Sequence, residues 1–250
     1  MRNNKILFSL YQIYKYIFFF PLLAISICIL IVFIFIFFYT ASERFVQIAG
    51  IAWTRFNSFI TPMFVTVIGK NNISKNQSYV IVANHQSLYD IFAIYGWLPV
   101  DFRWVMKIEL RHVPVLGYYC YKAGHIYIDR SDHQKALDSI NAAKNKIRNG
   151  TCIVFFPEGT RSMTGDLIEF KKGAFKFALD INLPILPVTI VGTRNILPAG
   201  TIGLFPGRAK LILHKPIEVT GYTEDTVKDL ISLVRQSIQK GLDEYTAPDA

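Results

Sequence analysis

An uncharged apolar run near the N-terminus constrains this chain more than any other feature. Residues 16–39 read YIFFFPLLAISICILIVFIFIFFY and contain no charged side chain over 24 positions. A helix needs about 20 such residues to cross the hydrocarbon core of a bilayer. The run is too long for the apolar part of a cleaved signal peptide, and no small-x-small cleavage site follows it. We therefore expect the chain to be attached to a membrane.

A second apolar segment covers residues 45–68, but Arg55 and Pro62 interrupt it. A charged side chain near the middle of such a segment favours contact with protein or with the membrane interface over exposure to lipid. The segment could cross the bilayer as the second arm of a helical hairpin, or it could lie in the interface without crossing. Either arrangement gives a two-helix, membrane-associated region at residues 1–70 and a separate domain at residues 71–250.

The net charge of +9 is concentrated near this membrane region. Residues 1–70 hold one acidic side chain, Glu43, and six basic ones: Arg2, Lys5, Lys15, Arg44, Arg55 and Lys70. Such a balance suits an anionic membrane surface as a partner. We expect no binding to nucleic acid, because the chain has no recognition motif for it and no long basic run.

The three cysteines, Cys28, Cys120 and Cys152, lie in apolar surroundings. No pair of them has the spacing of a metal or redox site, so we expect them to be reduced core residues. Reduced cysteines favour a domain that faces the cytosol.

Beyond a polar, turn-rich stretch at residues 69–78, short apolar runs alternate with helical patterns. The runs are rich in β-branched and aromatic residues and predict strands at residues 79–83, 102–106, 125–128, 151–156, 185–191 and 209–213. Helices are expected at residues 87–96, 132–148, 173–181 and 224–243. This alternation predicts an α/β domain with a mixed, largely parallel sheet flanked by helices. In such sheets the ligand site lies beyond the carboxyl ends of the strands.

The stretch VANHQSLYDIF, residues 82–92, places His85 and Asp90 where a buried strand ends. On one continuous helix, side chains five residues apart would point about 140° away from each other. They can meet if His85 lies in the turn before the helix and Asp90 in its first turn. Asp90 would then orient one imidazole nitrogen and leave the other free as a base. The competing interpretation is a capping box from Ser87 to Asp90, with His85 as an ordinary core residue.

Two further stretches carry candidate anion ligands at strand ends. In FFPEGTRS, residues 155–162, Gly159 lets backbone amides approach an anion, and Arg161 can hold a phosphate by two hydrogen bonds. GHIYIDR, residues 124–130, ends in Arg130, a second candidate phosphate ligand. The alternative for the first stretch is a surface turn with a local Glu158–Arg161 pair, and for the second a solvated arginine at a strand end.

Three lysines could add contacts to an anion, namely Lys107, Lys171 and Lys172. The alternative is that they are ordinary charges flanking helices and strands. The stretch LPILPVTIVGT, residues 183–193, reads as a core strand or as the wall of an acyl pocket.

Taken together, these stretches resemble the motifs of the glycerolipid acyltransferases, in particular the bacterial 1-acylglycerol-3-phosphate (lysophosphatidate) acyltransferases. NHQSLYD is similar to the family's N-H-x-x-x-x-D motif, and GHIYIDR, FPEGTRS and LPILPV follow in the family's order. The likeness covers about residues 79–200 and implies that His85 is the general base and that Asp90 orients it. It also implies acceptor-binding roles for Arg130, Glu158, Gly159, Thr160 and Arg161.

The resemblance implies direct transfer of an acyl group to the sn-2 hydroxyl of lysophosphatidate, giving phosphatidate. The donor would be a thioester of coenzyme A or of acyl carrier protein, and no cofactor or metal would be needed. Acyl thioesters are cytosolic, and the basic residues before residue 16 favour a cytosolic N-terminus. We therefore expect the domain on the cytosolic face of a bacterial inner membrane, with two crossings or none.

Three alternative functions remain from the sequence. Another lipid could be the acceptor within the same family. A hydrolase could use His85, Asp90 and Glu158 to bind a metal or activate water. A non-catalytic lipid-binding protein could keep the same residues.

Overall fold

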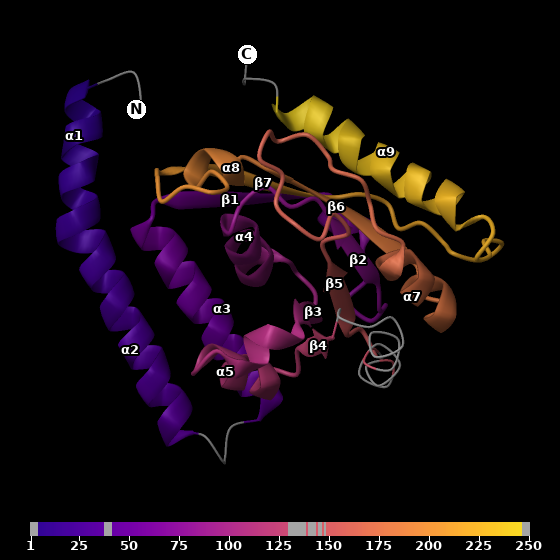
Figure 1. The fold of residues 1–250 in the computed structure, drawn as a ribbon, viewed down its shortest axis with the longest axis horizontal. Helices are drawn as coiled ribbons and strands as arrows, with labels where there is room; N and C mark the ends of the chain where they lie inside the picture. The colour runs from indigo at the N-terminus through magenta and orange to yellow at the C-terminus, as the bar shows by residue number, and fades with distance from the viewer. Residues whose placement is uncertain are drawn as a thin grey trace.

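A seven-stranded sheet lies at the centre of the computed structural model, which describes residues 5–37, 42–129 and 149–246 and the single residues 139, 144 and 147 (Figure 1). The strand order across the sheet is β1-β7-β6-β2-β5-β3-β4. The strands are β1 Met63–Ile68, β2 Val80–Ala83, β3 Phe102–Lys107, β4 Ile126–Ile128, β5 Cys152–Phe155, β6 Ile185–Val191 and β7 Gly207–Leu213. All neighbours pair in parallel except β6 and β7, which are antiparallel. The predicted mixed, largely parallel sheet is confirmed.

Helices cover both faces of this sheet. The helices of the described residues are α1 Lys5–Tyr14, η1 Lys15–Phe19, α2 Phe20–Ile36, α3 Glu43–Ile60, η2 Lys70–Asn72, α4 Tyr89–Trp97, η3 Ile108–His112, α5 Leu116–Lys122, α7 Gly173–Ile181, α8 Thr193–Ile196 and α9 Val227–Thr246. Alternate residues of β2 divide between two cores, with Val80 and Val82 packed in the core of α7 and α9, and Ile81 and Ala83 in the core of α4. Because both faces are covered, the strand is apolar throughout.

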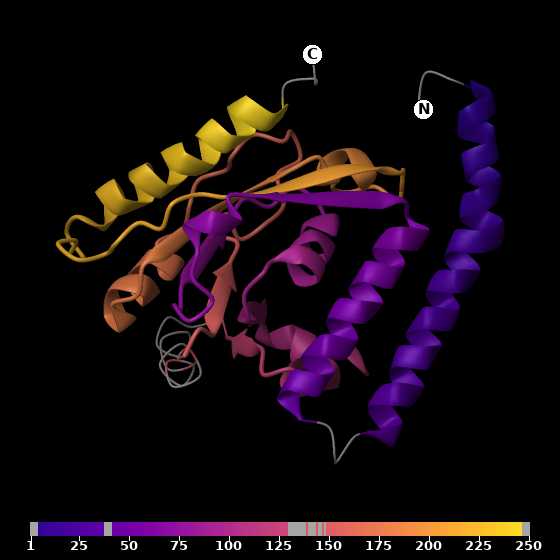
Figure 2. The same ribbon diagram turned by 180° about the vertical axis from the view of Figure 1, so that it is seen from behind.

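The N-terminal helices α1, η1 and α2 follow one another without a break and run along one side of the molecule (Figure 2). Within the part of the chain that the structure describes, Lys5–Phe33 is the one helix long and apolar enough to cross a membrane. One face of it packs on the domain, where Phe19 is buried beside Tyr14, Leu22 and Leu23. The rest is exposed, so the predicted apolar helix is present as a largely uncovered surface.

Large aliphatic side chains form two exposed stripes on this helix. Ile6, Leu10, Ile13 and Ile17 make the first stripe, and Ile25, Ile29, Val32 and Ile36 make the second. Each stripe has the spacing of one helix face. The π-helix η1 contains Ile17, the last residue of the first stripe, and ends before the second stripe begins.

Helix α3 is packed between α2 and the sheet domain rather than standing free. Arg55 Nε donates to the carbonyl oxygen of Gly96 at 2.7 Å, and its guanidinium lies 5.9 Å from the ring of Trp97. On the side of α2, Asn57 is buried and lies 3.3 Å from Ser26 Oγ through its Oδ1. Arg55 thus contacts protein, one of the two environments expected for it. The expected two-helix membrane motif is shown only in part, because α3 packs one face on the domain.

The second apolar segment, residues 45–68, divides into two elements. Its last part is β1, an edge strand of the sheet that pairs with β7. The division predicted at residues 70 and 71 therefore leaves one strand of the central sheet on the N-terminal side. Pro62 lies in the turn between α3 and β1. Apolar residues lie on both sides of it, so hydrophobicity alone does not show where the helix ends and the strand begins. The helix expected at 132–148 lies mostly outside the described residues.

Gly50 provides a test of how closely α3 packs on the domain. A Cβ atom at this position would lie 1.7 Å from Tyr119 Oη and 2.8 Å from Tyr95 Cε1. We expect Gly50→Ala to lower the free energy of unfolding by about 1–3 kcal/mol, as overpacking does, measured by chemical denaturation in detergent. Gly173→Ala is the control, because a Cβ there meets nothing within 4 Å. Equal stabilities of the two variants would contradict this packing.

Candidate active site

The site begins where β2 leaves the sheet, at Asn84. Its side-chain Nδ2 donates to the carbonyl oxygen of Ile190 at 2.9 Å, and its Oδ1 accepts from Ile190 N at 2.7 Å. The side-chain amide thus replaces a peptide group of β2 in the ladder to β6. Because the neighbouring strand is satisfied in this way, the main chain is free to turn and to carry His85 out over the carboxyl edge.

His85 and Asp90 form the predicted pair. His85 Nδ1 lies 2.8 Å from Asp90 Oδ2, and the Asp90 carboxylate is fully buried. His85 Nε2 has no hydrogen-bond partner among the residues that the structure describes, and the ring is 14% exposed. With Nδ1 donating to the carboxylate, the lone pair is on Nε2, which is then available as a base.

Asp90 accepts hydrogen bonds from four donors. Besides His85 Nδ1, its Oδ2 accepts from Gln86 N at 2.6 Å and Ser87 N at 2.8 Å. Its other oxygen, Oδ1, accepts from the hydroxyl of Thr193. A carboxylate this deeply buried needs such partners to remain ionised.

The capping interpretation of Ser87 and Asp90 holds in part. Asp90 accepts from Ser87 N, which is the return bond of a capping box, while Ser87 Oγ accepts from Tyr89 N at 3.0 Å instead of Asp90 N. Ser87 Oγ also donates to the carbonyl oxygen of Leu197 at 2.7 Å. The helix start and the His85 pairing use the same carboxylate and do not exclude each other.

Aromatic side chains from neighbouring strands support the imidazole ring. The ring of Phe156, just beyond β5, stacks on His85 with 4.0 Å between centroids and 13° between planes. Trp104 of β3 stacks behind Phe156 at 5.5 Å. The predicted carboxyl edge of the sheet therefore carries the site, with β2, β5 and β3 side by side.

The carboxylate of Glu158 is engaged by the protein's own backbone. Oε1 accepts from His85 N at 2.8 Å and Oε2 accepts from Ile168 N at 3.0 Å, and the residue is 3% exposed. Burial raises the pKa of Glu158 above its ordinary value, against the lowering effect of these two donors and of His85. The same loop also holds His85 from its other side, because Ser162 N donates to the His85 carbonyl oxygen at 2.8 Å.

The side chain of Lys171 lies against the turn at Gly159, whose φ is +72°. Arg161 is half-buried and makes no hydrogen bond or ion pair with any described residue. A Cβ on Gly159 would lie 2.9 Å from Lys171 Nζ, so the turn needs glycine both for its backbone and for this close approach. Thr160 is exposed beside them. Gly159, Thr160, Arg161 and Lys171 thus come together next to His85.

The other residues predicted to contact an anion lie in different parts of the molecule. Lys107 is exposed at the last position of β3, on the same edge of the sheet. Lys172 lies on another side, where it helps Lys176 to lower the pKa of Glu224. Arg130 lies outside the described residues.

Sequence reasoning missed Thr193 and Phe156 as site residues. Thr193 contacts Asp90 from 103 positions away, and no local pattern indicates such a contact.

Among the described residues, no group of three or more His, Cys, Asp or Glu side chains is placed to hold a metal ion. His125 is buried and accepts from Trp104 N at 3.3 Å, away from the His85–Asp90 pair.

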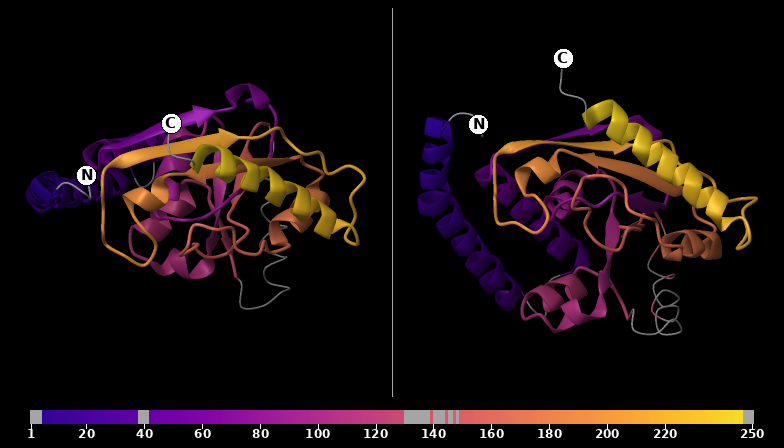
Figure 3. Two further views of the ribbon diagram at one scale, coloured as in Figure 1. Left: turned by 90° about the horizontal axis from the view of Figure 1, so that it is seen from above. Right: turned by 45° about the horizontal axis from the view of Figure 1, so that its top comes forward.

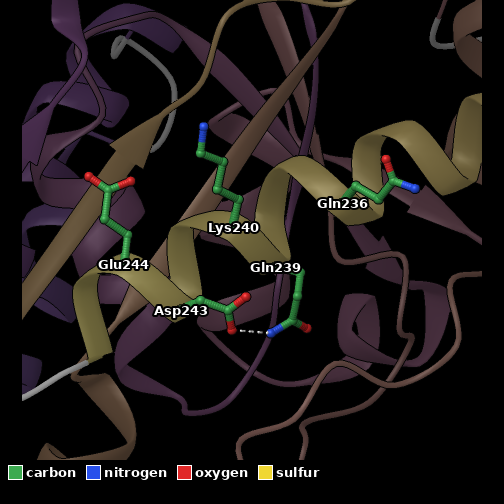
Figure 4. A pocket seen from close by; sticks show the side chains of 5 residues that line it. All are labelled: Gln236, Gln239, Lys240, Asp243 and Glu244. Atoms are coloured by element: carbon green, nitrogen blue, oxygen red, sulfur yellow. Dashed lines mark hydrogen bonds between the residues drawn. The ribbon is translucent and has the colours of Figure 1, made fainter.

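A hollow on the surface of α9 is unrelated to this site. Its lining residues are Gln236, Gln239, Lys240, Asp243 and Glu244 (Figure 4). All five come from one helix, and Gln239 Nε2 donates to Asp243 Oδ1 at 2.8 Å. None of them takes part in the contacts of His85, Asp90 or Glu158.

Comparison with known proteins gives a consistent result. The sequence model of the family described as Acyltransferase matches residues 64–191. A 1-acyl-sn-glycerol-3-phosphate acyltransferase of Chlamydomonas reinhardtii is 34% identical over 155 residues, which are 61% of this chain and 46% of that protein. A protein of the same name from Saccharomyces cerevisiae is 34% identical over 184 residues, 72% of this chain and 60% of the relative. The chain thus spans about half of the length of these curated relatives.

A solved structure has the same fold. It is the crystal structure of a 1-acyl-sn-glycerophosphate acyltransferase from Thermotoga maritima, with a TM-score of 0.72 and 29% sequence identity. The match covers 83% of each chain.

Asn84 tests how the site is built at the end of β2. Asn84→Leu leaves the buried N–H and C=O of Ile190 without partners, so we expect the free energy of unfolding to fall by about 2–5 kcal/mol. Asn72→Leu is the matched control, because Asn72 Nδ2 makes one half-exposed hydrogen bond, to the carbonyl oxygen of Leu213. Chemical denaturation should show that Asn84→Leu lowers the free energy of unfolding at least twice as much as Asn72→Leu does. A loss in Asn84→Leu no larger than that in Asn72→Leu would contradict this account.

Proposed function

This chain belongs to the acyltransferase family, and from that membership we propose that it transfers a fatty acyl group from an acyl thioester to the sn-2 hydroxyl of lysophosphatidate. The observation that carries the proposal is His85 held on Asp90, with a free Nε2 beside the cationic turn of Gly159 and Arg161. A base next to an anion site suits an acceptor that has both a hydroxyl and a phosphate. The names of the similar proteins agree with this acceptor.

The proposed reaction is a direct transfer between the two substrates. His85 Nε2 removes the proton of the acceptor hydroxyl as its oxygen attacks the thioester carbonyl. Asp90 stabilises the imidazolium that forms on His85. The tetrahedral intermediate then collapses, the carbon–sulfur bond breaks, and the thiolate leaves and takes up a proton. An ester of the acceptor and a free thiol are the products.

The acceptor phosphate is proposed to bind at Arg161 and Lys171, with Lys107 and Arg130 as further candidates. Arg161 can present two parallel N–H groups to a phosphate and has no competing carboxylate partner among the described residues. Holding the phosphate fixes the distance from the hydroxyl to His85, and such positioning contributes much of the rate of a two-substrate reaction.

Glu158 is proposed to act differently from the acceptor contact expected from the resemblance. Both of its oxygens already accept from backbone N–H groups, one of them that of His85 itself. We assign it to holding the His85 main chain against the loop 157–168. The acceptor then contacts the neighbouring cations instead of this carboxylate.

The N-terminal helices are proposed to attach the domain to a membrane. Both exposed stripes lie on the segment from α1 to α2, while α3 buries one face against the domain and exposes Phe45, Ile48, Phe56 and Phe59 on its other face. This arrangement favours a helix that lies in the membrane interface over two free membrane-spanning arms. The site would face the cytosol, where acyl thioesters are found, at the surface that holds acceptor and product.

The central experiment tests the reaction and the base together. Purified protein in detergent is given lysophosphatidate with a long-chain acyl-CoA or acyl carrier protein, with and without a chelator. We expect phosphatidate in both cases, and we expect His85→Ala to lower kcat by about 10²–10⁴-fold, as loss of a general base does. Free fatty acid or free phosphate as the sole product would refute the proposal. A higher kcat/KM with another lysophospholipid would show that this lipid, and not lysophosphatidate, is the preferred acceptor.

Substitutions at Arg161 and Glu158 should separate acceptor binding from positioning. Arg161→Ala should raise the KM for lysophosphatidate roughly 10–100-fold, from the loss of hydrogen bonds to a charged group. Glu158→Gln should lower kcat with little change in that KM. Lys172→Ala is the control and should behave like the wild type, because Lys172 lies toward Glu224. A large rise in KM for Glu158→Gln would instead indicate contact with the acceptor.

Charged substitutions in the second exposed stripe, on α2, test the membrane attachment. Ile25→Glu combined with Ile29→Glu should weaken binding to vesicles that contain anionic lipid by at least about tenfold, because two exposed aliphatic side chains no longer enter the bilayer. Flotation with the vesicles measures the bound fraction. The control is Leu233→Glu combined with Gln236→Glu on α9, which lies on the far side of the sheet from α2 (Figures 1 and 2). If both double variants lose vesicle binding to the same extent, the second stripe is not the attachment surface.

A further inference from the structure

The second oxygen of Asp90 has its own partner from a distant part of the chain. His85 and two backbone N–H groups occupy Oδ2, and the hydroxyl of Thr193 donates to Oδ1. Asp90 and Thr193 are both fully buried. Water therefore has no access with which to replace the hydroxyl if it is removed.

The turn after β6 brings Thr193 to this position. The strand ends at Val191, and Gly192 has φ +90°, a conformation that residues with a side chain rarely adopt. A Cβ on Gly192 would also lie 2.1 Å from the carbonyl oxygen of Arg208. Glycine thus permits the chain to leave the sheet sharply, so that α8 starts at Thr193 and faces the start of α4. The short helix α8 packs against α4 at this edge of the sheet (Figure 3).

We propose that Thr193 is a positioning residue for the His85–Asp90 base, an inference that rests on the proposed function. Its hydroxyl fixes the plane of the carboxylate so that Oδ2 faces Nδ1 of His85. The same hydrogen bond satisfies the oxygen that would otherwise be buried without a donor. Thr193 does not touch the substrates and acts through Asp90.

The proposal predicts how the base titrates. A hydrogen bond spreads the negative charge of a carboxylate, so that loss of the Thr193 hydroxyl leaves more charge on Asp90. Asp90 then holds the imidazolium more strongly, and His85 must lose its proton at a higher pH before it can act. The acidic limb of the plot of kcat/KM against pH should therefore move to higher pH. The carboxylate of Glu158 also acts electrostatically on both members of the pair, and no substitution changes it. Arg161 on the same loop and Lys171, which contacts the turn at Gly159, are likewise unchanged.

Three variants test the role of the hydroxyl. Thr193→Val keeps the shape and removes the donor, and Thr193→Ser keeps the donor. Thr189→Val is the matched control, because Thr189 is also fully buried and donates to the carbonyl oxygen of Ile238 at 3.0 Å, away from Asp90. If Thr193→Val does not fold, Thr193→Ala takes its place.

For Thr193→Val we expect kcat about tenfold lower, from the loss of one hydrogen bond to a charged group. The KM for both substrates should stay within about twofold, since the residue touches neither. The acidic limb should move to higher pH. Thr193→Ser should restore both kcat and the pH profile, and Thr189→Val should lower stability without moving the limb. A profile unchanged in Thr193→Val, or Thr193→Ser as impaired as Thr193→Val, overturns the proposal.

A measurement without substrate separates this proposal from the proposed reaction. The ¹⁵N signals of His85, followed by NMR in detergent, report its pKa and tautomer directly. An upward shift of the His85 pKa in Thr193→Val but not in Thr189→Val supports the role of Thr193 even if no phosphatidate forms in the assay. The same His85 pKa in wild type and Thr193→Val overturns the role even if phosphatidate does form.

Discussion

The buried carboxylate of Asp90 is the interaction on which the site depends. It accepts four hydrogen bonds, and its donors come from the turn after β2, from the imidazole and from the start of α8. Such a group is costly to bury unless every partner is in place. The sheet order meets this demand, because β2 and β6 are neighbours and end at the same edge. The position of the base is thus a property of the sheet as much as of the motif that contains it.

Contacts that are local in the chain could be predicted, and contacts between distant residues could not. The five-residue separation of His85 and Asp90 and the period of the helix were enough to place one before the helix and the other in its first turn. The bonds from Asn84 to Ile190, from Glu158 to His85 and from Thr193 to Asp90 join residues 106, 73 and 103 positions apart. They depend on strand order, which periodicity does not determine. The resemblance implied an acceptor-binding role for Glu158, and the contacts of its two oxygens with the N–H groups of His85 and Ile168 likewise depend on the tertiary fold.

Composition also could not separate the two environments that an apolar segment can enter. Residues 45–68 are as apolar as a membrane segment, yet α3 is amphipathic and packed against the domain, and β1 completes the edge of the sheet. The buried face of α3 carries polar residues such as Thr54, Asn57 and Ser58, which need protein partners rather than lipid. These polar positions, read at helical spacing, are the signal that distinguishes the two cases.

The π-helical turn at Lys15–Phe19 has a consequence for the helical phase of the N-terminal segment. Counted along a regular α-helix, the stripe from Ile25 to Ile36 would be rotated by about 100°, the rotation of one residue, from the stripe that ends at Ile17. A π turn contains one residue more than an α turn and absorbs that rotation. The outward surface can therefore stay nearly straight. A chain shorter by one residue at this turn could keep the same alignment as a regular helix, whereas a deletion elsewhere in the segment would twist its two halves apart.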